Sequence, residues 1–118
     1  MDKKEIRRQY KETVQPMGVY QLRNTVNGKI FIASSKNLKA KENSFIFQTR
    51  LGAHVSSELQ NDYNTFGADK FVFEILDYLE PKEGVNYDYT QDLSALEELW
   101  VEKLQPFGEK GYNRKKDK

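Results

Sequence analysis

Few side chains in this sequence have a type and position that indicate chemistry. It has no cysteine and a single histidine, His54, which excludes disulfides, a cysteine nucleophile and a multi-histidine metal site within one chain. His54 follows Gly52 where a helix is expected to begin, a position typical of a cap or surface histidine. Glu97 and Trp100 are three residues apart and share one helix face, where a carboxylate is either solvated or a metal ligand.

The positions of the charges, more than their sum, bear on possible partners. The net charge is +1, but residues 1–73 balance at +5, residues 74–102 at −8 and residues 103–118 at +4. Because screening limits each charge to about 10 Å, a phosphate-binding surface needs only local positive potential. Nucleic acid is therefore not excluded, although a solvated surface with unevenly placed charges is the simpler interpretation of charge alone.

The length and hydropathy of the chain indicate a single-domain protein. The 118 residues suit one core, and no apolar run approaches the roughly 18 residues of a membrane span. The first ten residues lack the apolar stretch of a secretory signal. We expect a cytoplasmic protein without a membrane partner, with an N-terminal helical extension over 1–16, a domain over 17–113 and a basic tail over 114–118.

The elements that must position these residues begin with a hairpin. A charged helix is predicted over residues 3–12. Residues 18–24 alternate apolar and polar side chains, which predicts a half-buried strand. Asn27-Gly28 predicts a tight turn in which both residues have positive φ. Residues 29–33 are then the returning strand.

The sequence after residue 33 predicts helices and one further strand. Capping residues over 34–38 predict a short helix through about Lys41, with residues 45–47 as an extended or buried run. Residues 54–66 show helical spacing and end at Gly67, residues 71–76 form a third strand, and residues 81–90 form a polar loop. Asp92 or Ser94 is expected to cap a final helix. Its broad apolar face consists of Leu96, Leu99, Trp100, Val101 and Leu104. The fold class is α+β, a small antiparallel sheet with helices packed on it.

Two tripeptides on the predicted hairpin resemble a known signature. Gly18-Val19-Tyr20 and Phe31-Ile32-Ala33 are separated by ten residues, an arrangement similar to the paired motif of the GIY-YIG nuclease superfamily. The resemblance covers about residues 17–113 and is closest to bacterial stand-alone or regulator-associated members. Further similar motifs occur in the family's order: Asn24…Asn27-Gly28-Lys29, Ser34-Ser35-Lys36-Asn37-Leu38, His54…Leu59-Gln60, Asn64…Phe66-Gly67, Phe71-Val72-Phe73-Glu74-Ile75-Leu76, Glu97…Trp100 and Gly111-Tyr112-Asn113.

The resemblance implies a three-stranded antiparallel sheet flanked by helices and a phosphodiesterase site. In active members a glutamate of the last helix holds one divalent ion, usually Mg²⁺. The first tripeptide's tyrosine or a neighbouring group activates water, and an arginine on the first long helix stabilises the phosphoryl charge. Carried onto this sequence, the tyrosine is Tyr20, the metal glutamate is Glu97, the family's asparagine is Asn113 and a histidine common in one branch is His54.

Four positions depart from the family pattern. Phe31 replaces the tyrosine of the second tripeptide, and Ala33 replaces its glycine, where a methyl group occupies a place of close approach. Lys41 stands in the arginine position and keeps the charge without the two-pronged guanidinium. Phe45, one helical turn later, occupies a frequent histidine position. Because each lost electrostatic or acid–base group typically costs about 10²–10⁴ in rate, these departures indicate a catalytically degenerate site.

The function expected from this resemblance is a nuclease-like protein that binds DNA without efficient cleavage. The basic residues expected near the substrate are Lys36, Lys39, Lys41 and Arg50. One alternative is an active Mg²⁺-dependent DNA endonuclease of low or specialised activity. A further alternative is a protein-interaction module that uses Phe45-Ile46-Phe47 as an exposed anchor.

Overall fold

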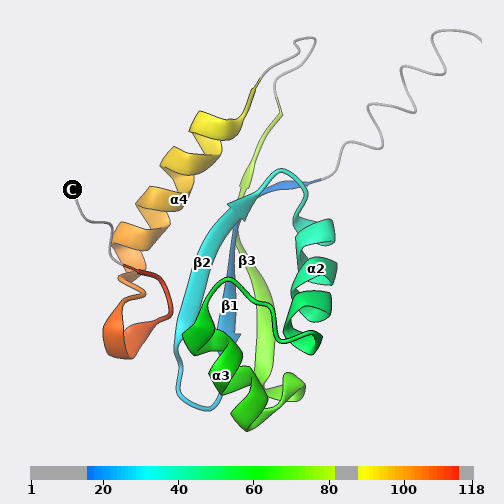
Figure 1. The fold of residues 1–118 in the computed structure, drawn as a ribbon. Coiled ribbons are helices and arrows are strands. Elements are labelled where there is room, and N and C mark those ends of the chain that lie inside the picture. The colour runs from blue at the N-terminus through cyan, green and yellow to red at the C-terminus, as the bar shows by residue number, and fades with distance from the viewer. Residues whose placement is uncertain (1–15, 82–87, 115–118) are drawn as a thin grey trace, which may run out of the picture.

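The protein forms one three-stranded sheet with helices on both sides (Figure 1). The computed structural model describes residues 16–81 and 88–114, so the predicted helix over 3–12 and most of the loop over 81–90 lie outside the described residues. None of the described helices has the length and apolarity to cross a lipid bilayer. The elements are β1 (Met17–Asn24), β2 (Ile30–Ser35), α2 (Leu38–Arg50), α3 (Ser57–Phe66), η1 (Ala68–Lys70), β3 (Phe71–Leu79), α4 (Thr90–Leu104) and η2 (Gly108–Lys110).

The sheet has the order β2-β1-β3, and both pairings are antiparallel. β1 is therefore central, and β2 is an edge strand. α4 lies on one side of the sheet, whereas α2 and α3 lie on the other (Figure 1). The predicted α+β class with a three-stranded antiparallel sheet is confirmed.

The hydrophobic core lies between the sheet and the α2–α3 layer. Alternate residues of β1, Tyr20 and Leu22, point into it because successive side chains of a strand face opposite sides. The other buried members come from α2, α3, β3 and the C-terminal segment: Leu38, Phe45, Leu59, Phe71 and Tyr112. Tyr20 of the first tripeptide motif thus belongs to the same core as the helices that follow it.

The β1–β2 hairpin is confirmed, but its turn differs from the prediction. Arg23 is the last β1 residue that pairs with β2, at Ile30, so the connection is longer than a two-residue turn. Gly28 has φ 78°, whereas Asn27 is not among the residues with positive φ. The Asn27 side chain instead accepts a hydrogen bond from the Lys29 N–H at 2.9 Å. An asparagine that bonds the backbone two residues on stabilises such a loop without left-handed geometry of its own.

α2 is much longer than the short helix that was predicted. It extends to Arg50, so the expectation of an extended run over 45–47 is wrong. The Asn37 side chain caps the helix by accepting from the Ala40 N–H at 3.0 Å. Phe45 and Thr49 continue the buried face, and the Thr49 hydroxyl donates to the Phe45 carbonyl at 2.7 Å. Tertiary burial of this face outweighs the weak helix propensity of Asn43 and Ser44.

The other helices begin at different residues than predicted. α3 begins at Ser57 with Ser56 as its cap, and Gly67 ends it as predicted, with φ 99°. β3 continues to Leu79, beyond the predicted residue 76. α4 begins at Thr90, so Asp92 and Ser94 lie inside it and do not cap it.

The apolar face of α4 is narrower than predicted. Leu99 is 60% exposed, whereas Leu93, which was not expected on this face, is buried. The other predicted members, Leu96, Trp100, Val101 and Leu104, are half-buried. One helix side therefore faces the sheet and leaves Leu99 in solvent.

A close backbone contact makes Gly18 a sensitive position. A Cβ at Gly18 would lie 2.0 Å from the Asp77 carbonyl oxygen on β3. We expect Gly18→Ala to lower the free energy of unfolding by about 3 kcal/mol, because the β1–β3 pairing must shift. Gly28→Ala is the control, since nothing lies within 4 Å there and only the left-handed backbone costs about 1 kcal/mol. Urea denaturation of both variants measures the difference, and equal losses would contradict the contact.

Candidate functional site

The residues predicted to form the site are arranged along four consecutive positions of the edge strand β2. Phe31 contacts His54, and the backbone of Ile32 binds Asn113. Ala33 pairs with Tyr20 across the hairpin, and the Ser34 hydroxyl donates to Glu97. Four residues of a strand span about 10 Å and alternate in direction, so β2 has the His54 contacts on its α2–α3 side and Glu97, from α4, on the other side.

His54 lies against the two phenylalanines that occupy degenerate positions. The centroids of the Phe31 and His54 rings are 5.3 Å apart with an interplanar angle of 80°. The Phe45 ring also meets His54 edge-to-face, at 5.7 Å and 85°. Where the resemblance implies a phenol and an imidazole, this chain therefore places two apolar rings around its only histidine.

Hydrogen bonds from the start of α3 fix the His54 imidazole and its backbone. The Ser56 N–H donates to His54 Nδ1 at 3.0 Å, and the His54 N–H donates to Gln60 Oε1 at 3.1 Å. Gln60 is buried and donates in turn to the Thr49 carbonyl at 3.0 Å. Burial lowers the pKa of His54; a backbone hydrogen bond with Ser56 acts in the opposite direction, and the positive charge of Lys41 adds to the lowering. The net effect leaves the imidazole neutral at pH 7.

Glu97 and Tyr20 form the second part of the site. Ser34 Oγ donates to Glu97 Oε1 at 2.9 Å, which positions the carboxylate beside β2. Tyr20 is only 3% exposed and its ring stacks on Phe73 with centroids 4.8 Å apart. Burial raises the pKa of the Tyr20 phenol, and the negative charge of Glu97 raises it further. The phenol is therefore protonated throughout the physiological range.

The oxygen atoms around Glu97 fit a hard divalent cation only in part. Mg²⁺ is commonly bound through one or two carboxylates, with water completing its shell. Glu97 supplies one carboxylate, and Ser34 uses only its Oε1 atom. Among the described residues no three His, Cys, Asp or Glu side chains come together as a metal site. An ion here would therefore be bound by Glu97 and water, and it would supply Lewis-acid stabilisation of phosphoryl charge.

Asn113 has a structural contact with β2. Its Oδ1 accepts from the Ile32 N–H and its Nδ2 donates to the Ile32 carbonyl, both at 2.8 Å. This pair satisfies backbone groups that an edge strand would otherwise leave open. Both ends of the Asn113 amide are thus engaged with Ile32.

The adjacent Tyr112 connects the C-terminal segment to α3 and β1. Its hydroxyl donates to Asp62 Oδ2 at 2.6 Å and accepts from Asn24 Nδ2 at 3.0 Å. Burial and the bond to Asp62 raise the pKa of Tyr112 to about 12. The phenol therefore stays a hydrogen-bond donor and holds these elements together.

The structure separates the predicted basic residues into two groups. A helix turns about 100° per residue, which places Lys39 and Arg50 within about 20° of each other but Lys41 about 200° from Lys39. Lys41 shares its flank with Phe45, four residues later, whose ring contacts His54. Lys36 follows Ser34 by two residues and makes an exposed ion pair with Asp88 at 3.6 Å. Lys36 and Lys41, which we call the site lysines, therefore flank the site, whereas Lys39 and Arg50 do not.

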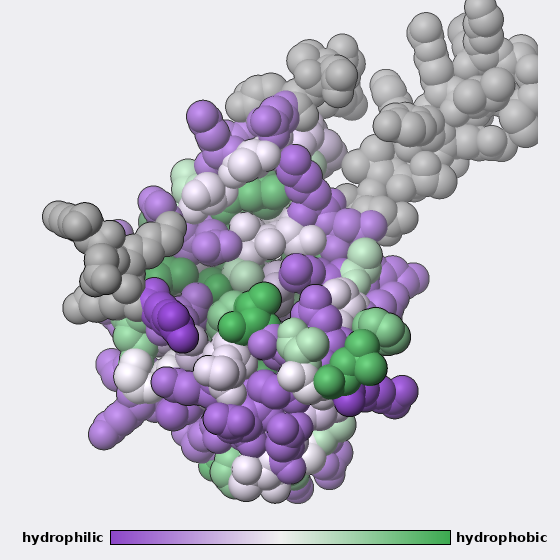
Figure 2. All heavy atoms as spheres, viewed as in Figure 1, coloured by the Kyte–Doolittle hydropathy of each residue, from purple (hydrophilic) through white to green (hydrophobic). Residues whose placement is uncertain are grey.

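The face of the molecule shown in Figure 2 is mostly hydrophilic, with separate hydrophobic areas. Of the proposed protein-interaction anchor, Phe45 is buried, whereas Ile46 and Phe47 are 45% and 65% exposed. The three residues therefore do not form one exposed anchor.

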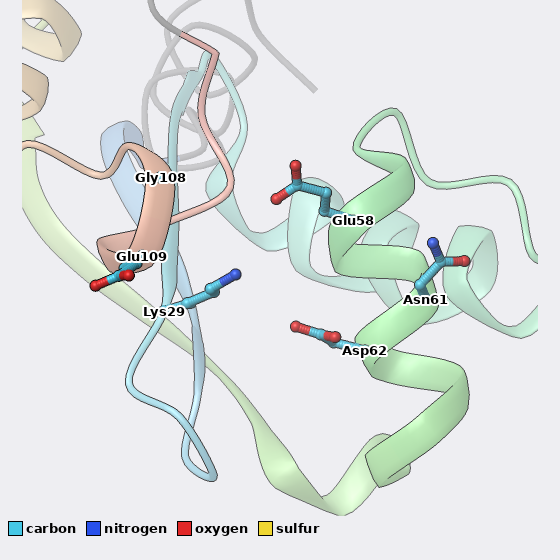
Figure 3. A pocket seen from close by; sticks show the side chains of 6 residues that line it. All are labelled: Lys29, Glu58, Asn61, Asp62, Gly108 and Glu109. Carbon is cyan, nitrogen blue, oxygen red and sulfur yellow. The ribbon is translucent and has the colours of Figure 1, made fainter.

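A cavity of about 450 Å³ lies between α3, η2 and Lys29, which directly precedes β2 (Figure 3). The Glu58 and Asp62 side chains project from α3 toward Lys29 (Figure 3), and Glu109 also lines the cavity. Three carboxylates against one amine make an unfavourable environment for a phosphate. The lining of this cavity is therefore mainly acidic, unlike the region around the site lysines.

The three-stranded antiparallel sheet with its helices has a GIY-YIG nuclease-like fold, as predicted. The chain is similar to the catalytic domain of the homing endonuclease I-TevI, with a TM-score of 0.70 and 25% sequence identity. That match covers 85% of this chain and 99% of that domain. A variant of the same domain with a glutamate replaced by alanine matches with a TM-score of 0.69 and 26% identity, over 84% of this chain and 93% of that one.

A curated relative is intron-associated endonuclease 1 of Enterobacteria phage T4. It is 29% identical over 88 residues, which are 74% of this chain and 32% of that protein. The chain thus spans about a third of the length of this relative. No family model matches the sequence.

Two further residues of the site were not predicted from the sequence in these roles. Ser34 was interpreted as a capping residue, yet it positions Glu97. Ser56 fixes the His54 ring, but it was not singled out. Because Ser34 directly follows the second tripeptide and alternates with Ala33, its opposite orientation was the one available signal.

Proposed function

We propose that this domain binds DNA through the site lysines and does not efficiently cleave it. The observation that carries the proposal is that neither Tyr20 nor His54 is available to accept a proton from water. Tyr20 is buried and its phenol is held protonated. His54 already uses the unprotonated Nδ1 atom as an acceptor for the Ser56 N–H.

Hydrolysis of a phosphodiester requires a group that accepts the proton of the attacking water. With Phe31 and Phe45 at two positions where polar groups are implied, neither ring that contacts His54 can serve as a replacement base. Binding has weaker requirements, because it depends on positive charge and hydrogen-bond donors rather than on proton transfer. Lys36, Lys41 and the His54 imidazole meet these requirements.

Titration of the protein with duplex and branched DNA tests the binding half of this proposal. Fluorescence anisotropy is measured at several salt concentrations. The logarithm of the DNA affinity is expected to fall linearly with the logarithm of the salt concentration. Salt-independent association, or no association at low salt, would contradict DNA binding.

A second candidate function is a metal-dependent endonuclease of low activity, and one contact favours it. The Ser34–Glu97 bond holds the carboxylate in a fixed orientation while leaving Glu97 Oε2 without a hydrogen bond from the described residues. Calorimetric titration with Mn²⁺ tests this candidate. Binding that is lost in Glu97→Ala would support it, and the same weak heat in both proteins would count against it.

A further inference from the structure

We propose that His54 is a neutral, fixed hydrogen-bond donor for DNA, with its Nε2–H donating to a phosphodiester oxygen beside the Lys41 ammonium. This inference rests on the proposed DNA-binding function. It assigns the histidine a role opposite to that of a general base.

The tautomer follows from one hydrogen bond. The Ser56 N–H donates to His54 Nδ1 at 3.0 Å, so Nδ1 carries the lone pair. In a neutral imidazole the other nitrogen then carries the proton. His54 is half-buried, and none of the described residues accepts a hydrogen bond from its Nε2 atom. The free function of this side chain is therefore one N–H donor.

The surroundings of His54 hold the ring in this state. Phe31 and Phe45 contact it edge-to-face, which restricts rotation about its side-chain bonds. Ser56 is also the cap of α3, since its hydroxyl accepts from the Leu59 N–H at 3.3 Å. Exchanging the two ring nitrogens would leave the Ser56 N–H against a protonated atom. The fold thus disfavours the other tautomer and the imidazolium.

The phosphodiester is the ligand class that matches this donor. Lys41 lies one helical turn before Phe45 on α2, and the Phe45 ring contacts His54, so the positive charge of Lys41 attracts an anion to the same place. A neutral N–H beside an ammonium gives a phosphate one directed hydrogen bond and one point charge. The two contributions can be separated, because only the charged group releases counterions when DNA binds.

The tautomer can be measured directly because the chain contains one histidine. Long-range ¹H–¹⁵N correlation spectra of the labelled full chain are expected to show a protonated Nε2 and an unprotonated Nδ1 at pH 7. Adding a DNA duplex is expected to shift the Nε2–H resonance and leave the tautomer unchanged. A protonated Nδ1 in the free protein, or an unmoved Nε2–H with DNA bound, would overturn the inference.

Two substitutions separate the donor from the acceptor. His54→Asn keeps an oxygen near the Nδ1 position and loses the Nε2–H, whereas His54→Gln retains an amide donor near the Nε2 position. We expect His54→Asn to weaken DNA binding about tenfold and His54→Gln to weaken it less. Neither should change the salt slope, because no charge is removed. Circular dichroism and urea denaturation identify any variant that fails to fold.

The outcomes distinguish this inference from the proposed function. If the unaltered protein binds no DNA, both are wrong. If it binds DNA and His54→Asn binds equally well, only the donor role is wrong. A reduced salt slope in His54→Asn would indicate a charged imidazolium and would also overturn it. The spectra provide a second test that does not depend on the folding of either variant.

Discussion

Replacing both site lysines, Lys36 and Lys41, with glutamine should weaken DNA binding about 100-fold at low salt. Each contact between a charged group and a phosphate contributes roughly a factor of ten, and the two lysines flank the region that holds His54 and Glu97. The slope of the logarithm of affinity against the logarithm of salt should also fall by about 2, because two counterion-releasing groups are lost. Anisotropy titrations at several salt concentrations measure both quantities.

The matched control for this prediction removes the same charge from the other side of α2. In Lys39→Gln with Arg50→Gln the net charge changes equally, but the affected side chains lie away from His54. We expect a loss of less than about threefold from this control. Equal losses in the two double variants would mean that DNA responds to total charge rather than to the proposed site.

The second large effect is on stability. Leu59 on α3 is completely buried and packs in the core that contains Tyr20 and Leu22. We expect Leu59→Ala to lower the free energy of unfolding by about 3 kcal/mol, through lost burial and the cavity that remains. Urea denaturation followed by circular dichroism measures this loss.

Leu99→Ala is the control for Leu59→Ala because it makes the same change on a helix, at a side chain that is 60% exposed. A cost below about 0.5 kcal/mol is expected there. A similar cost at both positions would contradict the assignment of the core to the α2–α3 side of the sheet.

The sequence was sufficient to predict the elements whose signals are local. Alternation over residues 18–24 and the glycine at position 28 identify the hairpin, because strand period and left-handed backbone are properties of short segments. The ordered motifs then identified the α+β fold. Gly67 correctly predicted the end of α3, since its φ of 99° suits glycine.

The parts that were predicted wrongly depend on tertiary contacts. α2 continues through Asn43 and Ser44 because Phe45 and Thr49 are buried against the core, which local propensity does not report. At Asn27, a side-chain bond to Lys29 replaces the expected turn geometry. The prediction that Asp92 or Ser94 caps α4 was also wrong, because the helix begins at Thr90. The Thr90 N–H instead donates to Asp88, which lies outside the helix, at 3.0 Å.

The candidate site was predictable as a list of residues but not as an arrangement. The motifs identified Tyr20, His54 and Glu97, yet the Ser56 N–H on His54 Nδ1 and the Ser34 bond to Glu97 join residues that share no sequence pattern. The assignment of Arg50 to the same flank as Lys39 required the true length of α2. The short helix predicted through about Lys41 does not reach Arg50.

The central claim, binding without cleavage, is tested most directly by one measurement. End-labelled duplex and branched DNA are saturated with the protein in the presence of Mg²⁺ or Mn²⁺, and bound and cut DNA are quantified in the same samples over time. Because neither Tyr20 nor His54 is available to accept a proton from water, we expect the DNA to be bound and to remain intact. Metal-dependent cleavage that disappears in Glu97→Ala would contradict the account and establish an active nuclease.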